Sequence, residues 1–357
     1  MTAETSRANR LGTALSFGVV AGLLIVFFQA SVAALVFSGP GLEPYVAPGT
    51  GAFLLGTVIL IATVSFSSST APIVAYVQEE PAAVLSVMTA AMIAEVAPAT
   101  ADQELGTIIA TMAMASAFAG ATCWVLGRFS LGQIVRFLPY PVGGGFLAGT
   151  GWLVFSGGIS VATGGTDIGP DLLTGDLPQR WLPALVFGVA LLVLLRRWTH
   201  FLVLPTMFVI AIAGFHATYV LVADGSGSAE DDGWLLGPFP SGRMWQPDTV
   251  TSIADADWGA VFGQAAGFGA IVVVAIVALL LNYSGLETAM RTDIDVDAEL
   301  RHTGLGNLVN GAVGCPPGFV AFGMSSLGHR LGARTRSGII VTAGILVAVL
   351  AFGAGSI

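Results

Sequence analysis

The sequence predicts an all-α integral membrane protein in which two short half-helices, each preceded by an extended stretch, meet inside the membrane. The first observation behind this prediction is composition. Of the 357 residues, 55% are hydrophobic and 10% are charged, and the mean hydropathy is +0.84, whereas soluble proteins carry roughly a quarter charged residues. The second observation is a pair of interrupted hydrophobic stretches, and the third is the distribution of arginine. The expected surroundings are a lipid bilayer, and no basic block indicates a nucleic-acid partner.

Hydrophobic segments follow one another along the whole chain. They lie near residues 13–38, 50–67, 82–94, 105–126, 141–161, 181–195, 200–222, 262–283, 303–315, 318–328 and 337–354. Three of these segments, 82–94, 303–315 and 318–328, are too short to cross a bilayer alone, because a spanning helix needs about 20 apolar residues. A polar stretch at 223–261, rich in Asp and Glu, divides the chain, and we expect it to be an acidic extracellular loop.

The arginines predict an orientation. When the N-terminus is placed inside and the segments are counted in turn, eleven of the 13 basic residues fall on the cytoplasmic side. This bias is typical of membrane proteins and predicts a multi-pass protein of the plasma (inner) membrane with a cytoplasmic N-terminus. The cytoplasmic arginines are Arg7, Arg10, Arg128, Arg136, Arg196, Arg197, Arg291, Arg301, Arg330, Arg334 and Arg336, and the outer ones are Arg180 and Arg243.

Two stretches interrupt the hydrophobic pattern at corresponding positions of the two halves. Residues 75–84 contain Glu79, Glu80 and Pro81, and residues 314–326 restart a helix after two consecutive prolines. Backbone at membrane depth leaves helical geometry only where it lines protein or a cavity. Paired broken helices therefore predict the binding site of a secondary transporter.

Half-helices that meet near the midplane direct unpaired backbone N–H groups and a partial positive charge at one place, which favours an anion. Proline suits the start of the first half-helix because it lacks an N–H. The predicted amide donors to the substrate are those of Ala82, Ala83, Phe322, Gly323, Met324 and Ser325.

Glu79 and Glu80 place two acidic side chains at membrane depth, where charges are costly and indicate function. Both belong to the predicted substrate site, and three interpretations stay open. A buried carboxyl group could bind a proton together with an anion. The pair could instead hold a cationic solute or a basic amino acid, whose carboxylate the helix dipoles would hold. The carboxylates could also simply cap the helix start.

Several motifs resemble those of the sulfate permease (SulP) family of anion transporters, and the likeness extends over about residues 11–355. The motifs are GRFSLG at 127–132, RFLPYPVGGGFLAGTGWL at 136–153, GLGNLVNG at 304–311 and GARTR at 332–336. The resemblance implies two inverted seven-segment repeats, as in uracil-type transporters, which this chain follows through about eleven segments. It also implies a substrate role for Gln29 and a homodimer.

The same resemblance divides the chain into domains. It implies that residues 1–126 form segments 1–4 of a core domain, that 127–222 form segments 5–7 of a gate domain, and that 262–357 form core segments 8–11. The remaining gate helices and the cytoplasmic STAS domain of the family are expected to be absent from this sequence. The chain departs from the family pattern at the site, because Gln78-Glu79-Glu80 replaces small uncharged residues and Gly323-Met324 replaces a Ser-Arg pair.

Glu287 lies three residues after Ser284, so the two share one helical face. The resemblance implies that a carboxylate in this segment contributes to coupling, and we predict that these two residues hold a proton or sodium. The alternative is a carboxylate at a cytoplasmic helix end, close to Arg291. No metal site and no other cofactor is expected, because the histidines and cysteines lack metal-ligand spacing.

These features predict a SulP-like secondary active transporter that moves a small anion, such as sulfate or bicarbonate, by alternating access with proton or sodium coupling. One alternative is the same fold carrying a cationic solute or basic amino acid through Glu79 and Glu80. Another is a channel-like anion conductor, which saturable uptake would exclude. An enzyme is not expected, because no nucleophile–base pair is recognisable.

Overall fold

The computed structural model describes residues 2–37, 41–96, 100–132, 140–166, 168–198, 203–222, 229, 234–235, 243–333 and 335–353. Most of the stretch 223–242, the start of the motif at 136–153, and Arg334 lie outside the described residues.

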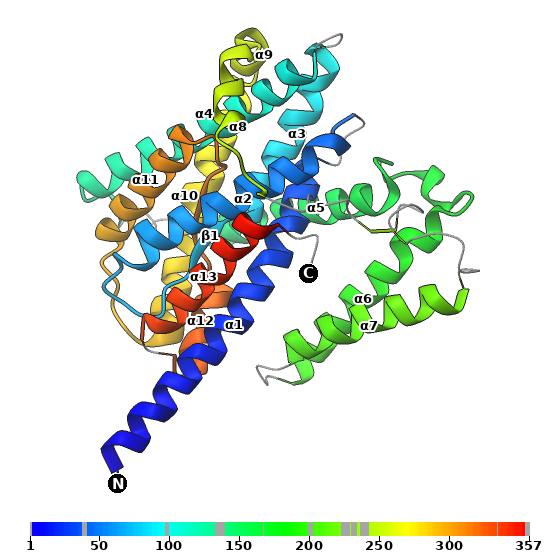
Figure 1. The fold of residues 1–357 in the computed structure, drawn as a ribbon. Coiled ribbons are helices and arrows are strands. Elements are labelled where there is room, and N and C mark those ends of the chain that lie inside the picture. Colours follow the sequence, from blue (N-terminus) through cyan, green and yellow to red (C-terminus); the bar gives the residue numbers. More distant parts are fainter. Residues whose placement is uncertain are drawn as a thin grey trace.

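Each hydrophobic segment expected from the sequence is a helix in the structure (Figure 1), which confirms the all-α membrane fold. Seven helices of the described chain are long and apolar enough to cross a membrane. In chain order the principal helices are α1 (Thr2–Val36), α2 (Val46–Leu60), α3 (Glu79–Val96), α4 (Ala101–Arg128), α5 (Tyr140–Thr163), α6 (Leu177–Arg197), α7 (Val203–Val222), α10 (Ala265–Met290), α11 (Val296–Ala312), α12 (Phe322–Arg330) and α13 (Ser337–Phe352).

Two short strands lie at the centre of the helices. β1 (Ala75–Val77) precedes α3, β2 (Gly318–Val320) precedes α12, and the strands pair antiparallel with Tyr76 opposite Phe319. They are the extended stretches expected before the half-helices. Their pairing brings the two interrupted segments, far apart in the sequence, to one place in the structure.

Side chains from the surrounding helices satisfy the backbone groups of these strands that the other strand leaves unpaired. Such groups are costly in an apolar interior because no water is present to bond them. Asn307 bonds both the N–H and the C=O of Gly318 at 2.8 Å. The other contacts are Gln29 to Val77 O, Val77 N to Thr57, Ala75 N to Ser65, Gln78 to Phe319 O and Asn282 to Val320 O, at 2.9–3.2 Å.

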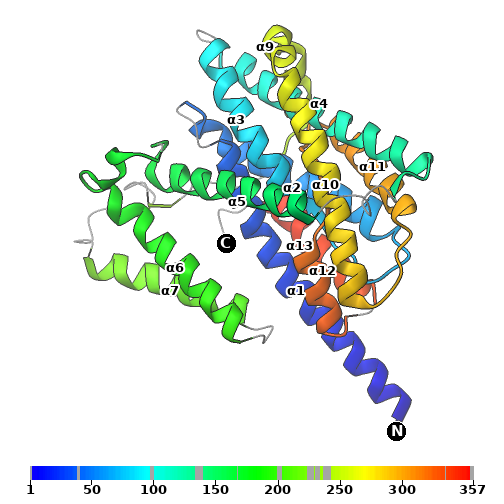
Figure 2. The same cartoon turned by 180° about the vertical axis from the view of Figure 1, so that it is seen from behind.

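Close glycine contacts hold the long helices around this centre. α11 packs along α4, and α13 packs along α1 (Figures 1 and 2). A Cβ atom on Gly304 would lie 2.5 Å from the backbone nitrogen of Trp124 and 2.8 Å from the carbonyl oxygen of Gly120. The backbones of α4 and α11 are therefore in direct contact, as small residues permit in membrane proteins.

A hydrogen bond joins the turn before α2 to the start of α4. The hydroxyl of Tyr45, in the 3-10 turn Glu43–Tyr45, donates to Glu104 at 2.7 Å. Burial, followed by the neighbouring Glu104 carboxylate, raises the pKa of Tyr45 to about 12. The hydroxyl therefore remains a proton donor at neutral pH.

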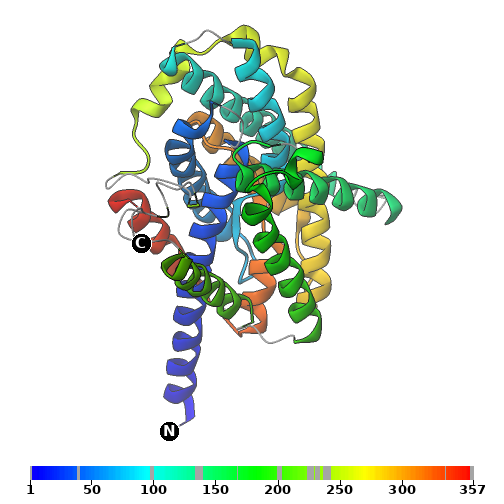
Figure 3. The same ribbon diagram turned by 90° about the vertical axis from the view of Figure 1, so that its right-hand side faces the viewer.

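α6 and α7 form a pair beside the remaining helices, on the side that carries α1 and α12 (Figure 3). They contact each other, and α6 also contacts α5, which in turn contacts α1 and α3. None of the residues of α6 is buried. The described part of the predicted extracellular loop contains short helices, α8 (Asp248–Thr251) and α9 (Trp258–Gly263), which pack on α4 rather than extending away from it.

Replacing Gly304 with alanine should separate α4 from α11, because the new methyl group meets backbone atoms that have no flexible end to move. We expect a loss of about 1–3 kcal/mol of stability, measured as a lower apparent unfolding temperature of the purified protein in detergent. The matched control is Gly344→Ala in α13, where a Cβ meets nothing within 4 Å. Equal unfolding temperatures for the two variants would contradict the proposed close contact.

Candidate functional site

The first half-helix, α3, carries acidic side chains at its own N-terminus. Glu79 and Glu80 form its first residues, and Pro81 follows. The Oε2 atom of each glutamate is buried without a hydrogen-bond partner among the described residues.

The alanine amides expected to bind substrate lie deeper in the same turn. Ala82 and Ala83 are both buried, and the Ala82 N–H is bonded to the carbonyl oxygen of Gln78 at 3.3 Å. The structure therefore places two carboxyl groups, rather than free amides, at the start of α3.

The second half-helix, α12, begins without a capping side chain. Ala321 precedes it and makes no side-chain hydrogen bond to it. The N–H groups of Phe322, Gly323 and Met324 belong to the first turn, where a helix provides no acceptor. A Cβ atom on Gly323 would meet nothing within 4 Å, so open space adjoins these amides. This end therefore suits a negative group.

The two serines of α12 differ in what their hydroxyl groups contact. Ser325 is fully buried, and its Oγ accepts a hydrogen bond from the N–H of Val74 at 2.9 Å. This contact supports the backbone that leads into β1. Ser326 donates to the carbonyl oxygen of Gly323 at 3.0 Å and lines a cavity.

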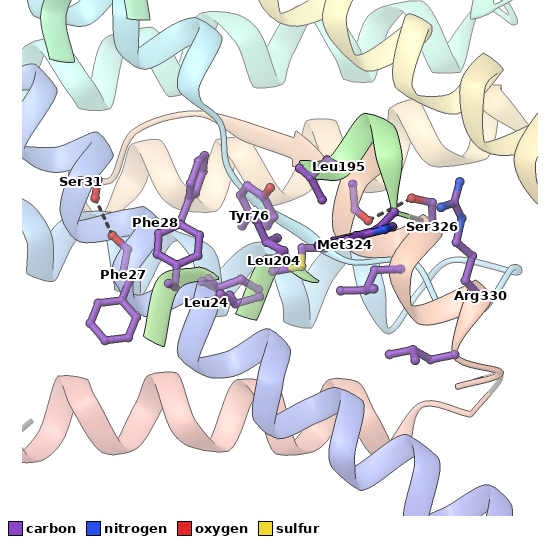
Figure 4. A pocket seen from close by; sticks show the side chains of 16 residues that line it. Leu24, Phe27, Phe28, Ser31, Tyr76, Leu195, Leu204, Met324, Ser326 and Arg330 are labelled. Atoms are coloured by element: carbon purple, nitrogen blue, oxygen red, sulfur yellow. Dashed lines mark hydrogen bonds between the residues drawn. The ribbon is translucent and has the colours of Figure 1, made fainter. Parts of the chain in front are cut away.

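That cavity has a volume of about 720 Å³ and lies between α1, β1 and α12 on one side and the α6–α7 pair on the other. α1 contributes Phe28, β1 contributes Tyr76, and α12 contributes Met324 and Arg330 (Figure 4). The opposite side is lined by residues of α6 and α7 or directly beside these helices, which are Leu195, Trp198, Leu204 and Phe208. The lining is mainly apolar and aromatic, with one arginine.

Tyr76 connects the cavity to the carboxylates. Its ring packs edge-to-face against Phe28, with ring centroids 5.3 Å apart, and its strand, β1, ends two residues before Glu79, where α3 begins. The carboxylates themselves are not among the residues that line the cavity. A solute in the cavity would therefore reach them past Tyr76.

Gln29 adds a further acceptor beside this junction. The side chain is fully buried and its Nε2 donates to Val77 O at 3.0 Å, while its Oε1 has no donor among the described residues. Within the described ranges, three buried acceptor atoms around the β1–α3 junction, on Gln29, Glu79 and Glu80, thus lack donors. Buried acceptors without partners are costly and indicate a missing donor, such as a cationic group, a proton or ordered water.

The predicted coupling residues lie outside the cavity lining. Glu287 Oε1 accepts a hydrogen bond from the N–H of Ile294 at 3.1 Å and so fixes the turn after α10. Ser284 is exposed on α10. Their role in ion coupling stays a prediction. The described residues contain no group of three or more His, Cys, Asp or Glu that could hold a metal.

Sequence reasoning did not single out Phe28, Tyr76 or Arg330 as site residues. A signal was available for two of them, since Tyr76 lies within the interrupted stretch at 75–84 and Phe28 precedes Gln29. The residues contributed by α6 and α7 carried no such signal, because their place depends on how two helix groups meet.

Comparison with known proteins identifies relatives of the whole arrangement. The model of the Sulfate permease family matches residues 14–357. The vacuolar basic amino acid transporter VSB1 of Saccharomyces cerevisiae is 25% identical over 242 residues, covering 65% of this chain and 23% of the yeast protein. The probable sulfate transporter MT1781 of Mycobacterium tuberculosis is 26% identical over 288 residues, covering 77% of this chain and 48% of the mycobacterial protein. The chain thus spans about half or less of these curated relatives.

Solved structures share the fold. The transmembrane domain of the cyanobacterial bicarbonate transporter BicA superposes with a TM-score of 0.62 at 19% identity, over 97% of this chain and 83% of that one. The murine anion transporter Slc26a9, in an inward-facing state, superposes with a TM-score of 0.63 at 16% identity, over 96% of this chain and 57% of that one.

Cysteine labelling tests which face of α12 borders the cavity. We expect Gly323→Cys to react with a small maleimide and Ser325→Cys to remain unmodified, because only the first position adjoins open space. The native Cys123 and Cys315 are buried and should give little background. Mass spectrometry of the folded protein measures both. Faster labelling at position 325 than at 323 would contradict this arrangement.

Proposed function

Because the chain belongs to the sulfate permease family, we propose that it forms the solute-binding part of a secondary transporter that works by alternating access. Support comes from the two half-helices that meet at the β1–β2 pair and from the cavity that α1, β1 and α12 form with α6 and α7. Sealing a solute at such a junction needs only movement of one helix group against the other. The plasma membrane location, cytoplasmic N-terminus and homodimer inferred from the sequence belong to the same proposal.

In this proposal the solute carries a positive group, as a basic amino acid does. The observation that carries it is that three buried acceptor atoms, on Gln29, Glu79 and Glu80, have no hydrogen-bond partner among the residues that the structure describes. An ammonium or guanidinium group supplies the missing donors and neutralises the charge, and its hydrogen bonds to a carboxylate are among the strong ones. The yeast relative, which is named as a basic amino acid transporter, agrees with this proposal. The open amides at Gly323 would hold the carboxylate of the same molecule.

A small inorganic anion, such as sulfate or bicarbonate, is the second candidate. The uncapped start of α12 and the presence of Arg330 in the cavity favour it, as does the name of the mycobacterial relative. In that case Glu79 and Glu80 would need to bind protons, since ionised carboxylates repel an anion. Such a transporter would be coupled to protons, whereas a sodium-coupled one would use a separate ion site.

The substrate class follows from equilibrium binding to the purified protein. We expect radiolabelled arginine to bind saturably and sulfate to bind weakly, and we expect Glu79→Gln/Glu80→Gln to lower arginine affinity at least tenfold because the charge-assisted hydrogen bonds are lost. Asp255→Asn, which removes an exposed acid on the loop before α9, is the control for net charge.

Saturable uptake into proteoliposomes, measured with and without a pH gradient, then separates carrier from channel. Sulfate binding that persists or strengthens in the double variant, with no arginine binding to the wild type, would establish the anion candidate instead.

A further inference from the structure

We propose that Tyr76 and Phe28 make this site selective for a planar guanidinium over a compact ammonium, so that arginine-like solutes are preferred to lysine-like ones. This inference rests on the proposed cationic solute. It adds the two residues that distinguish one cationic group from the other.

The aromatic pair is in the right place to do this. Both rings line the cavity, and their edge-to-face contact orients the Tyr76 ring against that of Phe28 (Figure 4). Tyr76 is held in β1, where the N–H and C=O of Val77 are fixed by Thr57 and Gln29. A ring on such a rigid support presents a defined surface to a solute, and cations are attracted to aromatic faces.

The chemistry on the two sides of Tyr76 suits a guanidinium. On one side two adjacent carboxyl groups, those of Glu79 and Glu80, each have one oxygen atom without a donor in the described part of the chain. A guanidinium carries five N–H donors in a planar fork, so one group can bond both oxygens, and its flat face can stack on an aromatic ring. An ammonium is a compact, strongly hydrated charge. In a lining of leucine, methionine and aromatic side chains it would lose that hydration with less compensation.

Arg330 fixes which end of the cavity accepts the cation. It lies seven residues after Gly323 on the nine-residue helix α12, which is about 10 Å along the helix axis. Its positive charge disfavours a cation at that end. The guanidinium is therefore directed to the Tyr76 end, where the carboxylates are.

Competition binding tests the inference. Unlabelled arginine and lysine compete against radiolabelled arginine on the purified full chain, in the wild type, Tyr76→Leu, Tyr76→Phe and Phe28→Leu. Trp152→Leu is the control, since Trp152 is an exposed aromatic residue of α5 that also packs on a phenylalanine but does not line the cavity.

We expect arginine to compete about tenfold better than lysine in the wild type and in Trp152→Leu. Tyr76→Leu and Phe28→Leu should lower arginine affinity about tenfold and lysine affinity less than threefold. Tyr76→Phe keeps the ring and should keep the preference for arginine. The unfolding temperature of Tyr76→Leu, compared with that of Tyr76→Phe, shows whether a loss of arginine affinity in Tyr76→Leu reflects misfolding.

Equal affinity for arginine and lysine in the wild type would overturn the inference but not the proposal of a cationic solute. An unchanged preference for arginine in both leucine variants would have the same consequence. Absence of any basic amino acid binding, accompanied by sulfate binding, would overturn both the cationic solute and the selectivity drawn from it.

Discussion

The need to pair backbone groups in a water-free interior governs this structure. Two three-residue strands cannot satisfy their own N–H and C=O groups, so they pair with each other and recruit polar side chains from α1, α2, α10 and α11. This explains why residues such as Asn307 and Thr57 are buried in a largely apolar protein. Because these side chains hydrogen-bond the strands, the starting points of the two half-helices that follow are fixed, and with them the position of the candidate site.

The two starting points differ in electrostatic character. The start of α3 carries two carboxyl groups, whereas the start of α12 has no capping side chain and has open space beside Gly323. A pair of identical helix ends would favour a single anion. A pair with opposite character favours a solute that is positive at one end and negative at the other, or an anion accompanied by protons.

Hydrophobic length and proline placement were enough to predict the helices and the two extended stretches, since these depend on local sequence and on the bilayer. The finer placement was not predictable from one sequence. Ser325 and Ser326 are neighbours with the same chemistry, yet the helical rotation of about 100° per residue puts one against Val74 and the other in the cavity. The contribution of Phe208 depends on how α7 meets the core helices, which no local pattern encodes.

The antiparallel pairing of β1 with β2 has a thermodynamic consequence. Because Tyr76 and Phe319 are held in register, a shift of α3 strains the strand that leads into α12, and a shift of α12 strains α3. If the proposed solute binds at both half-helix ends, occupancy of one end would change the affinity of the other, and the effect would be reciprocal. A solute that reaches only one end would then bind without this cooperative gain.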